Sequence, residues 1–306
     1  MSRIHEALKK AEQERASALA ATPAAPLAVA KPPVPPPVSP VAKHEGSVSP
    51  ALRAQPASEE FLRFDDLWKR CSQPGWLLDA GTSVFAHPDV PAAATEQFRT
   101  LRSRLYQIRD KQPLRTLLIT SALAAEGKTF IASNLAQTVV RQQEKRVLLI
   151  DADLRNPRLH LTLGAPSSPG ITDYLKGQAA ETAIIQRGLR ETLCFIPSGS
   201  LVPNPSELLA NGRLKVLLDR VTPLFDWVIV DSPPIGPVSD SLLLADLCDG
   251  VLVVVRAAST AYDLAQKSCQ EFQNKNLIGV VLNRVEKRTS YNAYQYYYQG
   301  NGNRKE

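Results

Sequence analysis

Three short stretches of the chain carry residues that could act together on a phosphate ester. The first is RTLLITSALAAEGKTFIASN, residues 115–134, in which an apolar run leads through small residues into Gly127, Lys128 and Thr129. A strand, a small-residue turn and a helix start in this order are typical of a phosphate-binding loop, where backbone N–H groups surround the phosphates. In such a loop Lys128 reaches the outer phosphates and the Thr129 hydroxyl binds Mg²⁺.

The loop departs from the usual glycine-rich pattern at two positions. Ala122 stands at the usual first glycine position, and Ala125 replaces a residue that is commonly glycine. Because alanine costs about 1 kcal/mol where φ is positive, we expect a strained or weakened loop if Ala125 adopts that conformation. A strand–turn–helix with an incidental Gly-Lys-Thr is the alternative.

Two further apolar runs end in acidic residues. Residues 147–150 lead into Asp151 and Asp153, and residues 227–230 lead into Asp231. The carboxyl ends of buried strands form the edge where open α/β sheets bind ligands, and buried acids are costly unless paired or bound to a cation. Three acids at one edge therefore suggest Mg²⁺, held by Asp231 through water. Asp151 and Asp153 would share a face, one as metal ligand and the other as base; the alternative for each acid is an ordinary strand-end cap.

The elements that position these residues alternate along the chain. Apolar runs predict strands at 115–120, 146–151, 193–197, 226–231, 250–256 and 277–283, and helical patterns lie near 128–142, 205–220, 239–247 and 260–273. Strands that are apolar throughout and alternate with helices indicate a mostly parallel sheet covered by helices on both faces. The sequence therefore predicts an α/β fold of the P-loop NTPase type.

The chain divides into five parts on its composition. They are an amphipathic N-terminal helix (1–20), a proline-rich linker (21–57), a connecting segment (58–84), the P-loop domain (85–287) and a tyrosine-rich C-terminal tail (288–306). Residues 23–56 hold ten prolines, so we expect an extended, disordered linker, and we expect the tail to be disordered too. An amphipathic pattern at 58–70 could pack on the main domain or dock elsewhere.

Composition excludes several classes of protein. The four cysteines are scattered without metal-binding spacing, which indicates a reduced, cytosolic protein without a structural metal. No apolar run reaches the roughly 18–20 residues of a membrane span, and the N-terminus has no signal-peptide core. The net charge of +6 is modest and dispersed, so we expect a solvated basic surface and no nucleic-acid partner.

Several stretches resemble the bacterial tyrosine kinases of capsule and exopolysaccharide synthesis, over roughly residues 85–298. SALAAEGKTFIASNLA resembles the family's Walker A loop, with Ala124-Ala125 where Pro-Gly is usual; LLIDADLRNPRLH resembles Walker A′, and VIVDSPP resembles Walker B. GITDYLKG, PSGSLVPNPSELL and VVLNRV are also similar to family segments. The resemblance implies ATP and Mg²⁺ as cofactors. It implies catalytic roles for Lys128, Asp151, Asp153 and Asp231, metal binding by Thr129 with the three aspartates, and nucleotide contacts from Ala124, Ala125, Glu126, Gly127, Lys128, Thr129, Phe130 and Asn283.

Two more features match the family pattern. Glu96, Arg99 and Arg102 are similar to its ExxRxxR oligomerisation motif, which implies a ring-forming contact; the alternative is a solvated salt-bridge row. Five of the eight tyrosines lie in the Gln/Asn/Gly-rich tail, where the alternative to a functional cluster is a sticky disordered segment. The resemblance implies that neighbouring subunits phosphorylate them and that the ring then comes apart. These tyrosines are Tyr291, Tyr294, Tyr296, Tyr297 and Tyr298.

The favoured function is an ATP-dependent protein-tyrosine autokinase that regulates polysaccharide synthesis and export. One alternative is a switch like the partition and division-site ATPases (the MinD/ParA type), although these carry a signature lysine where Leu123 stands here. Another is a nucleotide-binding regulator that has lost transfer activity. The resemblance implies a cytoplasmic protein at the inner membrane face, activated by a membrane polysaccharide co-polymerase, with a phosphotyrosine phosphatase as a further partner.

Overall fold

The computed structural model describes residues 63–85, 92–188, 192–236 and 239–285. The predicted N-terminal helix, linker and tail, including all five tail tyrosines, lie outside these ranges. The described helices are α2 (Phe64–Arg70), α3 (Ala92–Arg109), α4 (Lys128–Val139), α5 (Leu159–Leu163), α6 (Ile171–Leu175), α7 (Glu181–Ile184), α8 (Pro205–Leu209), α9 (Arg213–Val221), the 3₁₀ helix η1 (Thr222–Leu224), α10 (Asp240–Ala245) and α11 (Tyr262–Gln270). The strands are β1 (Thr116–Ser121), β2 (Val147–Asp151), β3 (Gln186–Arg187), β4 (Leu193–Ile196), β5 (Trp227–Asp231), β6 (Gly250–Arg256) and β7 (Leu277–Asn283).

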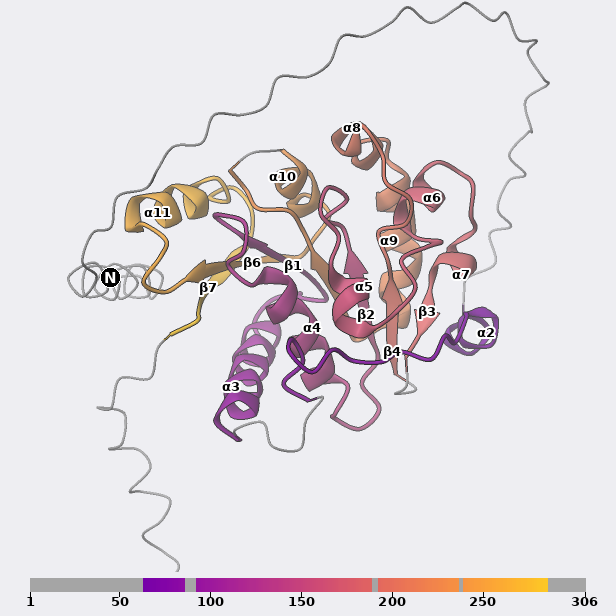
Figure 1. Ribbon diagram of the computed structural model, residues 1–306, viewed down its shortest axis with the longest axis horizontal. Coiled ribbons are helices and arrows are strands. Elements are labelled where there is room, and N and C mark those ends of the chain that lie inside the picture. The colour runs from indigo at the N-terminus through magenta and orange to yellow at the C-terminus, as the bar shows by residue number, and fades with distance from the viewer. Residues whose placement is uncertain (1–62, 86–91, 189–191, 237–238, 286–306) are drawn as a thin grey trace, which may run out of the picture.

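The strands form one sheet in the order β3-β4-β2-β5-β1-β6-β7. Every neighbouring pair is parallel except β3–β4, which is antiparallel. From β1 the chain moves past β5 to β2, and it later returns to place β6 on the other side of β1 (Figure 1). The carboxyl end of β1 is therefore the switch point at which such sheets bind ligands, and the loop at 122–127 starts there.

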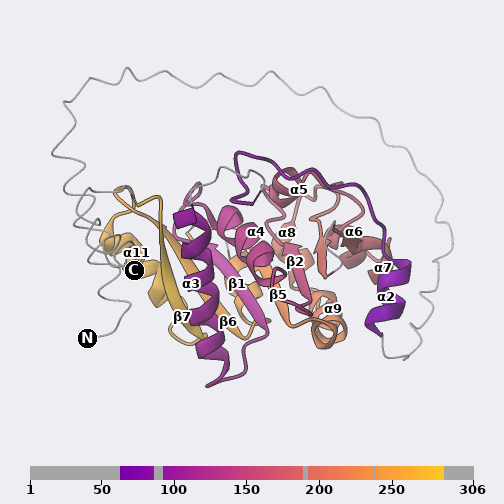
Figure 2. The same ribbon diagram turned by 90° about the horizontal axis from the view of Figure 1, so that it is seen from below.

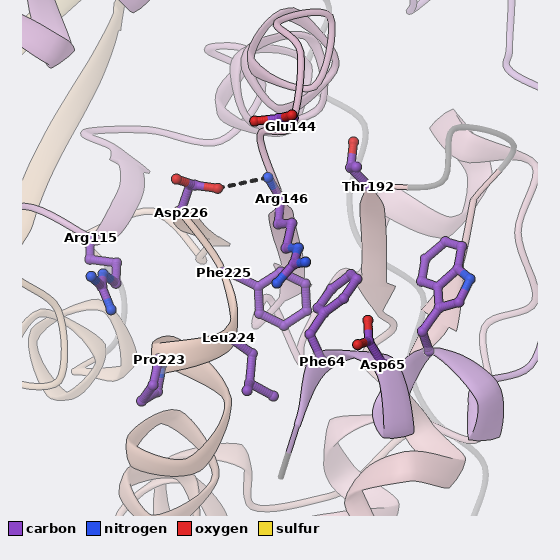
Figure 3. A pocket seen from close by; sticks show the side chains of 11 residues that line it. Phe64, Asp65, Arg115, Glu144, Arg146, Thr192, Pro223, Leu224, Phe225 and Asp226 are labelled. Atoms are coloured by element: carbon purple, nitrogen blue, oxygen red, sulfur yellow. Dashed lines mark hydrogen bonds between the residues drawn. The ribbon is translucent and has the colours of Figure 1, made fainter.

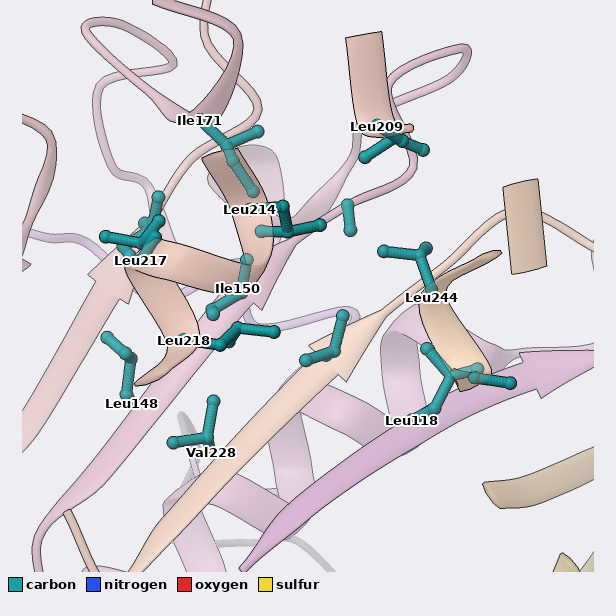
Figure 4. Packing of buried hydrophobic residues seen from close by; sticks show 14 of the residues in the cluster. Leu118, Leu148, Ile150, Ile171, Leu209, Leu214, Leu217, Leu218, Val228 and Leu244 are labelled. Carbon is teal, nitrogen blue, oxygen red and sulfur yellow. The ribbon is translucent and has the colours of Figure 1, made fainter. Parts of the chain in front are cut away.

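Helices cover both faces of the sheet, as predicted. On one face the odd-numbered residues of β2, Val147 and Leu149, pack with Leu105 of α3 and Leu135 of α4. Figure 2 shows α3 and α4 on the near side of the strands and α9 beyond them. On the opposite face a second cluster forms from strands β1, β2 and β5 with α9 and α10 (Figure 4). Its residues include Leu118, Leu148, Ile150, Val228, Leu214, Leu217, Leu218 and Leu244.

The described segment 63–85 packs on this domain, which answers the question left open for 58–70 in its described part, residues 63–70. Leu67 of α2 is 1% exposed and belongs to the second cluster, and Trp76 is 4% exposed against the first. Ser72 bridges to Gln186 of β3, so the segment also extends the sheet locally. Further along, the Val84 N–H donates to Asn134 Oδ1 of α4 at 2.8 Å.

The six predicted strands are confirmed, but the structure corrects the helix expected at 205–220. It is two helices, α8 and α9, separated at Gly212, which has φ of 80°. The two-residue strand β3 and the short helices α5, α6 and α7 were not predicted. In the part of the chain that the structure describes, no helix is both long and apolar enough to cross a membrane.

Candidate active site

The phosphate loop connects β1 to α4. Gly127 is the N-cap of α4 with φ of 99°, a conformation that favours glycine, and a Cβ there would lie 2.1 Å from the Asn283 amide nitrogen, so any larger residue would displace that amide. Within the described residues no side chain caps α4. The N–H groups of its first turn are therefore available to an anion, as the sequence predicted.

Ala125 adopts the left-handed conformation, with φ of 62°. This confirms the expected strain, which costs about 1 kcal/mol for an alanine. Leu123, Ala124 and Ala125 are exposed at the rim of the loop, whereas Glu126 is buried with its carboxylate turned into the domain. The Glu126 side chain is therefore directed away from this rim.

The charged residues of the three sequence stretches meet at the carboxyl edge of the sheet. Lys128 Nζ lies 3.0 Å from Asp153 Oδ2, and the Thr129 hydroxyl donates to Asp231 Oδ2 at 2.6 Å. Asp151 and Asp231 face each other in the parallel register of β2 and β5. The structure thus brings together the five residues that the sequence analysis assigned to catalysis and metal binding.

Two buried carboxylates in this group are incompletely satisfied. Asp151 and Asp231 are both 0% exposed, and the Oδ1 atom of each has no hydrogen-bond partner among the described residues. Asp151 Oδ2 accepts the Leu159 N–H at 3.0 Å. Because buried acceptors are normally paired, two orphaned oxygens on adjacent strands indicate a place for a ligand.

The pKa values of the group reflect this burial. Desolvation raises the pKa of Asp231 to about 7, although Lys128 and the Thr129 hydroxyl act in the opposite direction. Desolvation and then the charge of Asp231 raise the pKa of Asp151 well above its ordinary value. Burial alone would lower the pKa of Lys128, but the carboxylates of Asp231 and Asp153 outweigh it and raise that pKa.

The residues present fit a magnesium ion. Mg²⁺ prefers oxygen ligands and usually keeps several waters, binding proteins through one or two carboxylates plus substrate phosphates. The free Oδ1 atoms of Asp151 and Asp231 and the Thr129 hydroxyl provide such ligands. Over the described ranges no group of three His, Cys, Asp or Glu side chains is arranged to hold a metal unaided. A cation here would therefore need phosphate or water oxygens as well.

Sequence reasoning missed a polar cluster beside this site. Asp240 at the start of α10 is 0% exposed and accepts Arg155 Nε at 2.8 Å and the Ser206 hydroxyl at 2.5 Å. The cluster joins the turn after β2 to α8 and α10. The position of Arg155, two residues after Asp153, is a local signal from which a role at the site could have been predicted. Asp240 lies 85 positions further on, and no local pattern connects it to Arg155.

Asn283 and Phe130, two predicted nucleotide contacts, have well-defined surroundings. Asn283 ends β7 and donates its amide to the Glu126 carbonyl at 2.8 Å, so the structure brings it to the phosphate loop. The Phe130 ring lies in the first turn of α4 and packs edge-on against Phe98 of α3, with centroids 5.7 Å apart. Its side chain therefore points to α3.

The three motif residues of α3 do not form one uniform row. Glu96 and Arg99 form an exposed ion pair of 3.1 Å. Arg102 instead donates to the Thr138 carbonyl in the last turn of α4 at 3.0 Å, a favourable place for a cation. Arg102 is thus engaged within its own domain, while Glu96 and Arg99 face solvent.

A cavity of about 710 Å³ lies at the opposite edge of the sheet. Phe64 of α2 and Phe225 line it, and Figure 3 shows Arg146 beside their two rings. Arg115, Arg146 and Asp226 immediately precede β1, β2 and β5, which places the cavity at their amino ends. It is therefore separate from the loop and the aspartates.

Comparisons with known proteins agree with this geometry. Residues 117–301 match the family model described as the CobQ/CobB/MinD/ParA nucleotide binding domain. The chain is 33% identical over 217 residues to the tyrosine-protein kinase YwqD of Bacillus subtilis, covering 70% of this chain and 91% of that protein. It is 33% identical over 206 residues to the tyrosine-protein kinase CpsD of Streptococcus agalactiae, covering 66% of this chain and 89% of that protein.

Coverage is smaller for other relatives. The match to a putative tyrosine-protein kinase in the cps region of Klebsiella pneumoniae, at 35% identity, spans only 30% of that protein. Among solved structures, the kinase domain of the Escherichia coli tyrosine kinase ETK superposes with a TM-score of 0.63 at 33% identity, covering 66% of this chain and 80% of that one. The chain therefore belongs to the CobQ/CobB/MinD/ParA nucleotide-binding family and, within it, to the bacterial tyrosine-protein kinases.

Proposed function

We propose that this chain transfers the γ-phosphoryl group of MgATP to tyrosines in the C-terminal tail of a neighbouring copy. The observation that carries the proposal is the meeting of Lys128, Thr129 and the three aspartates 151, 153 and 231 at one edge of the sheet. The kinase names of the relatives support the reaction type. The five tyrosines at 291–298 supply phenols within the same chain.

Each residue would have a distinct part in the transfer. The loop N–H groups and Lys128 stabilise charge on the transferring group, for which Lys128 must leave Asp153. Thr129 and Asp231 hold Mg²⁺, which neutralises charge on the phosphates when bound. Of Asp151 and Asp153, one adds a metal ligand and the other accepts the phenol proton. The phenol oxygen bonds to the γ-phosphorus, the bridging P–O bond breaks, and ADP leaves with that electron pair.

Asn283 would select the base of the nucleotide. Its amide group donates to the Glu126 carbonyl, which leaves Oδ1 as an acceptor next to the loop. An exocyclic amine, as in adenine, matches that acceptor.

Two other functions have some support. The family match includes ATPase switches, and Ala125 in a strained conformation would suit a regulator with lost transfer. Incubating the full chain with MgATP separates all three. A kinase yields phosphotyrosine by mass spectrometry, a switch yields free phosphate without phosphotyrosine, and a regulator yields neither despite binding ATP. Lys128→Met should abolish phosphotyrosine, whereas Lys215→Met on the exposed face of α9 should not.

The setting of the reaction is also part of the proposal. We place the protein in the cytoplasm at the inner membrane face, recruited through residues 1–57 and activated by the cytosolic end of a membrane polysaccharide co-polymerase. A phosphotyrosine phosphatase reverses the modification. The cps-region name of one relative supports a link to capsule synthesis. Membrane association that survives deletion of residues 1–56 would end the recruitment part.

A ring of copies would bring the tail of one chain to the site of the next. The exposed pair Glu96 and Arg99 on α3 is free to contact a neighbour, whereas Arg102 would keep α3 in place against α4. Sedimentation of the Glu96→Ala, Arg99→Ala double variant should show smaller assemblies than the wild type. Arg104→Ala, on an exposed position of the same helix, should show no change.

A further inference from the structure

A buried carboxylate ties the phosphate loop to the end of the neighbouring strand β6 and to the turn before α11. Glu126 is 2% exposed and accepts the Leu123 N–H at 2.7 Å, the Arg256 N–H at 3.2 Å and the Thr260 hydroxyl. Within the described residues it forms no ion pair. Three donors therefore satisfy a charged group that would be costly to bury alone.

Two of the three donors come from distant parts of the chain. Leu123 belongs to the loop itself, Arg256 ends β6, and Thr260 lies just before α11. The end of β7 also contacts Glu126, because Asn283 donates to the Glu126 carbonyl. We call Glu126 with these partners the Glu126 junction. The loop is thus held by segments that follow it by 130 residues or more.

Backbone strain gathers at this junction. Only four non-glycine residues in the described ranges have positive φ, and three of them adjoin it: Ala125 at 62°, Ala258 at 56° and Arg284 at 56°. Ala125 precedes Glu126, Ala258 lies between Arg256 and Thr260, and Arg284 follows Asn283. Such conformations persist where the surroundings over-determine them, and they are concentrated at functional sites.

We propose that Glu126 is a positioning residue: its carboxylate holds Ala125 in the left-handed conformation and so keeps the loop N–H groups aimed at the phosphates. ATP affinity then depends on Thr260, although Thr260 is buried and acts only by donating its hydroxyl to Glu126. This inference rests on the proposed role of the loop in ATP binding. In this inference the loop main chain contacts the nucleotide, and the Glu126 side chain only positions that main chain.

The test is the affinity of the full chain for MgATP, measured by calorimetry. Glu126→Gln keeps the size of the side chain but puts an NH₂ donor against one of the donors, so Kd should rise about tenfold. Thr260→Val removes one donor and should raise Kd about threefold or more. Because glycine adopts positive φ without help, Ala125→Gly should recover most of the loss in both backgrounds and tighten binding by itself.

A control removes another carboxylate that accepts two backbone N–H groups, at the other end of β1, where it is exposed and remote from the loop. Asp249 accepts the Arg115 and Thr116 N–H groups, each at 2.7 Å, so Asp249→Asn should lower the unfolding temperature and leave Kd unchanged. Unchanged affinity in both Glu126→Gln and Thr260→Val overturns the inference, as does a loss that Ala125→Gly does not recover. A wild-type chain that takes up no nucleotide overturns the proposed function as well.

Discussion

Two aspartate oxygens at the edge of the sheet are buried without a hydrogen-bond donor among the described residues. They are Oδ1 of Asp151 and Oδ1 of Asp231, and the pKa of each carboxyl is raised, chiefly by burial. An arrangement like this destabilises the empty protein, since an unsatisfied buried acceptor costs about 1–3 kcal/mol. Under the proposed function, a cation and phosphates at this edge would satisfy the two oxygens. The free-energy cost in the ligand-free protein would then be offset on binding.

Replacing Asp231 by Asn should stabilise the nucleotide-free protein while abolishing phosphotransfer. The folded pKa of about 7 lies above the ordinary value of 3.8, so the folded state holds this proton more tightly than the unfolded state. The protonated Asp231 carboxyl therefore contributes to the free energy of unfolding below about pH 4, and this contribution is lost as the pH rises to about 7. Thermal unfolding should show a higher midpoint for Asp231→Asn at pH 8, with the gain shrinking by pH 5. A lower midpoint at pH 8 would contradict this.

Gly127→Ala should raise the Kd for the nucleotide by about tenfold or more, which corresponds to about 1.4 kcal/mol of binding free energy. A Cβ at this position meets the Asn283 amide nitrogen at 2.1 Å, in addition to the penalty of positive φ. Gly212→Ala is the matched control, because Gly212 has φ of 80° and no described atom outside its own neighbourhood lies within 4 Å of the added Cβ. Nucleotide titration should find Gly212→Ala close to wild type. Equal losses in both variants would contradict an effect specific to the phosphate loop.

The sequence identified the residues of the site whose signals are local. Lys128 and Thr129 follow one loop pattern, and the aspartates end apolar runs, so their meeting follows from a parallel sheet. The sequence could not reveal the partners of Arg155 or Glu126. Asp240 lies 85 positions from Arg155, and Thr260 lies 134 positions from Glu126, and only the folded chain brings them together.

At the scale of elements, α2 belongs to the folded domain. Leu67 lies in the core, while Phe64 and Trp68 stack with ring centroids 5.8 Å apart and also pack against that core. Arg146 lies over the Phe64 ring at 3.9 Å. The connecting segment therefore contributes both apolar area and cation–π contacts to the domain.

Shortening the buried side chain of α2 should lower the free energy of unfolding of the domain. Leu67→Ala should lower the free energy of unfolding by about 2–5 kcal/mol, because it removes a fully buried side chain from a packed core. Leu77→Ala, 81% exposed in the same segment, should change it by less than about 0.5 kcal/mol. Urea unfolding of the full chain measures both. Equal and small effects would show that α2 contributes no stability to the domain.

The element-level predictions failed for two different reasons. The helix predicted at 205–220 passed over Asn211-Gly212, a dipeptide typical of turns, and Gly212 in the left-handed conformation divides the segment into α8 and α9. β3 has only two residues, too few to produce a periodic signal, and its place depends on pairing with β4.

At the scale of the whole molecule, the two ends of the parallel strands carry different features. The carboxyl edge gathers the phosphate loop and the aspartates at the switch point beside β1. The amino edge holds the cavity between α2 and the turn before β5. Transfer between copies is a separate part of the proposal, because the tail tyrosines follow β7, whose last residue Asn283 contacts the phosphate loop of the same chain.

Mixing two full-length variants tests transfer between copies. The donor carries phenylalanine at all five tail tyrosines, and the acceptor carries Lys128→Met. The account predicts phosphotyrosine on the acceptor tail when both are present with MgATP, and none on either alone. Mass spectrometry of tail peptides reads the result. Phosphorylation that occurs only in a wild-type chain would contradict transfer in trans.

The most direct test of the account is calorimetric titration of the full chain with ATP, with and without Mg²⁺. If Lys128, Thr129 and the aspartates surround one magnesium–nucleotide, one ATP binds per chain and chelating Mg²⁺ weakens it about tenfold or more. In Asp231→Asn this dependence on Mg²⁺ should be largely lost. Equal affinity of the wild type with and without Mg²⁺, or no uptake of nucleotide, would contradict the account.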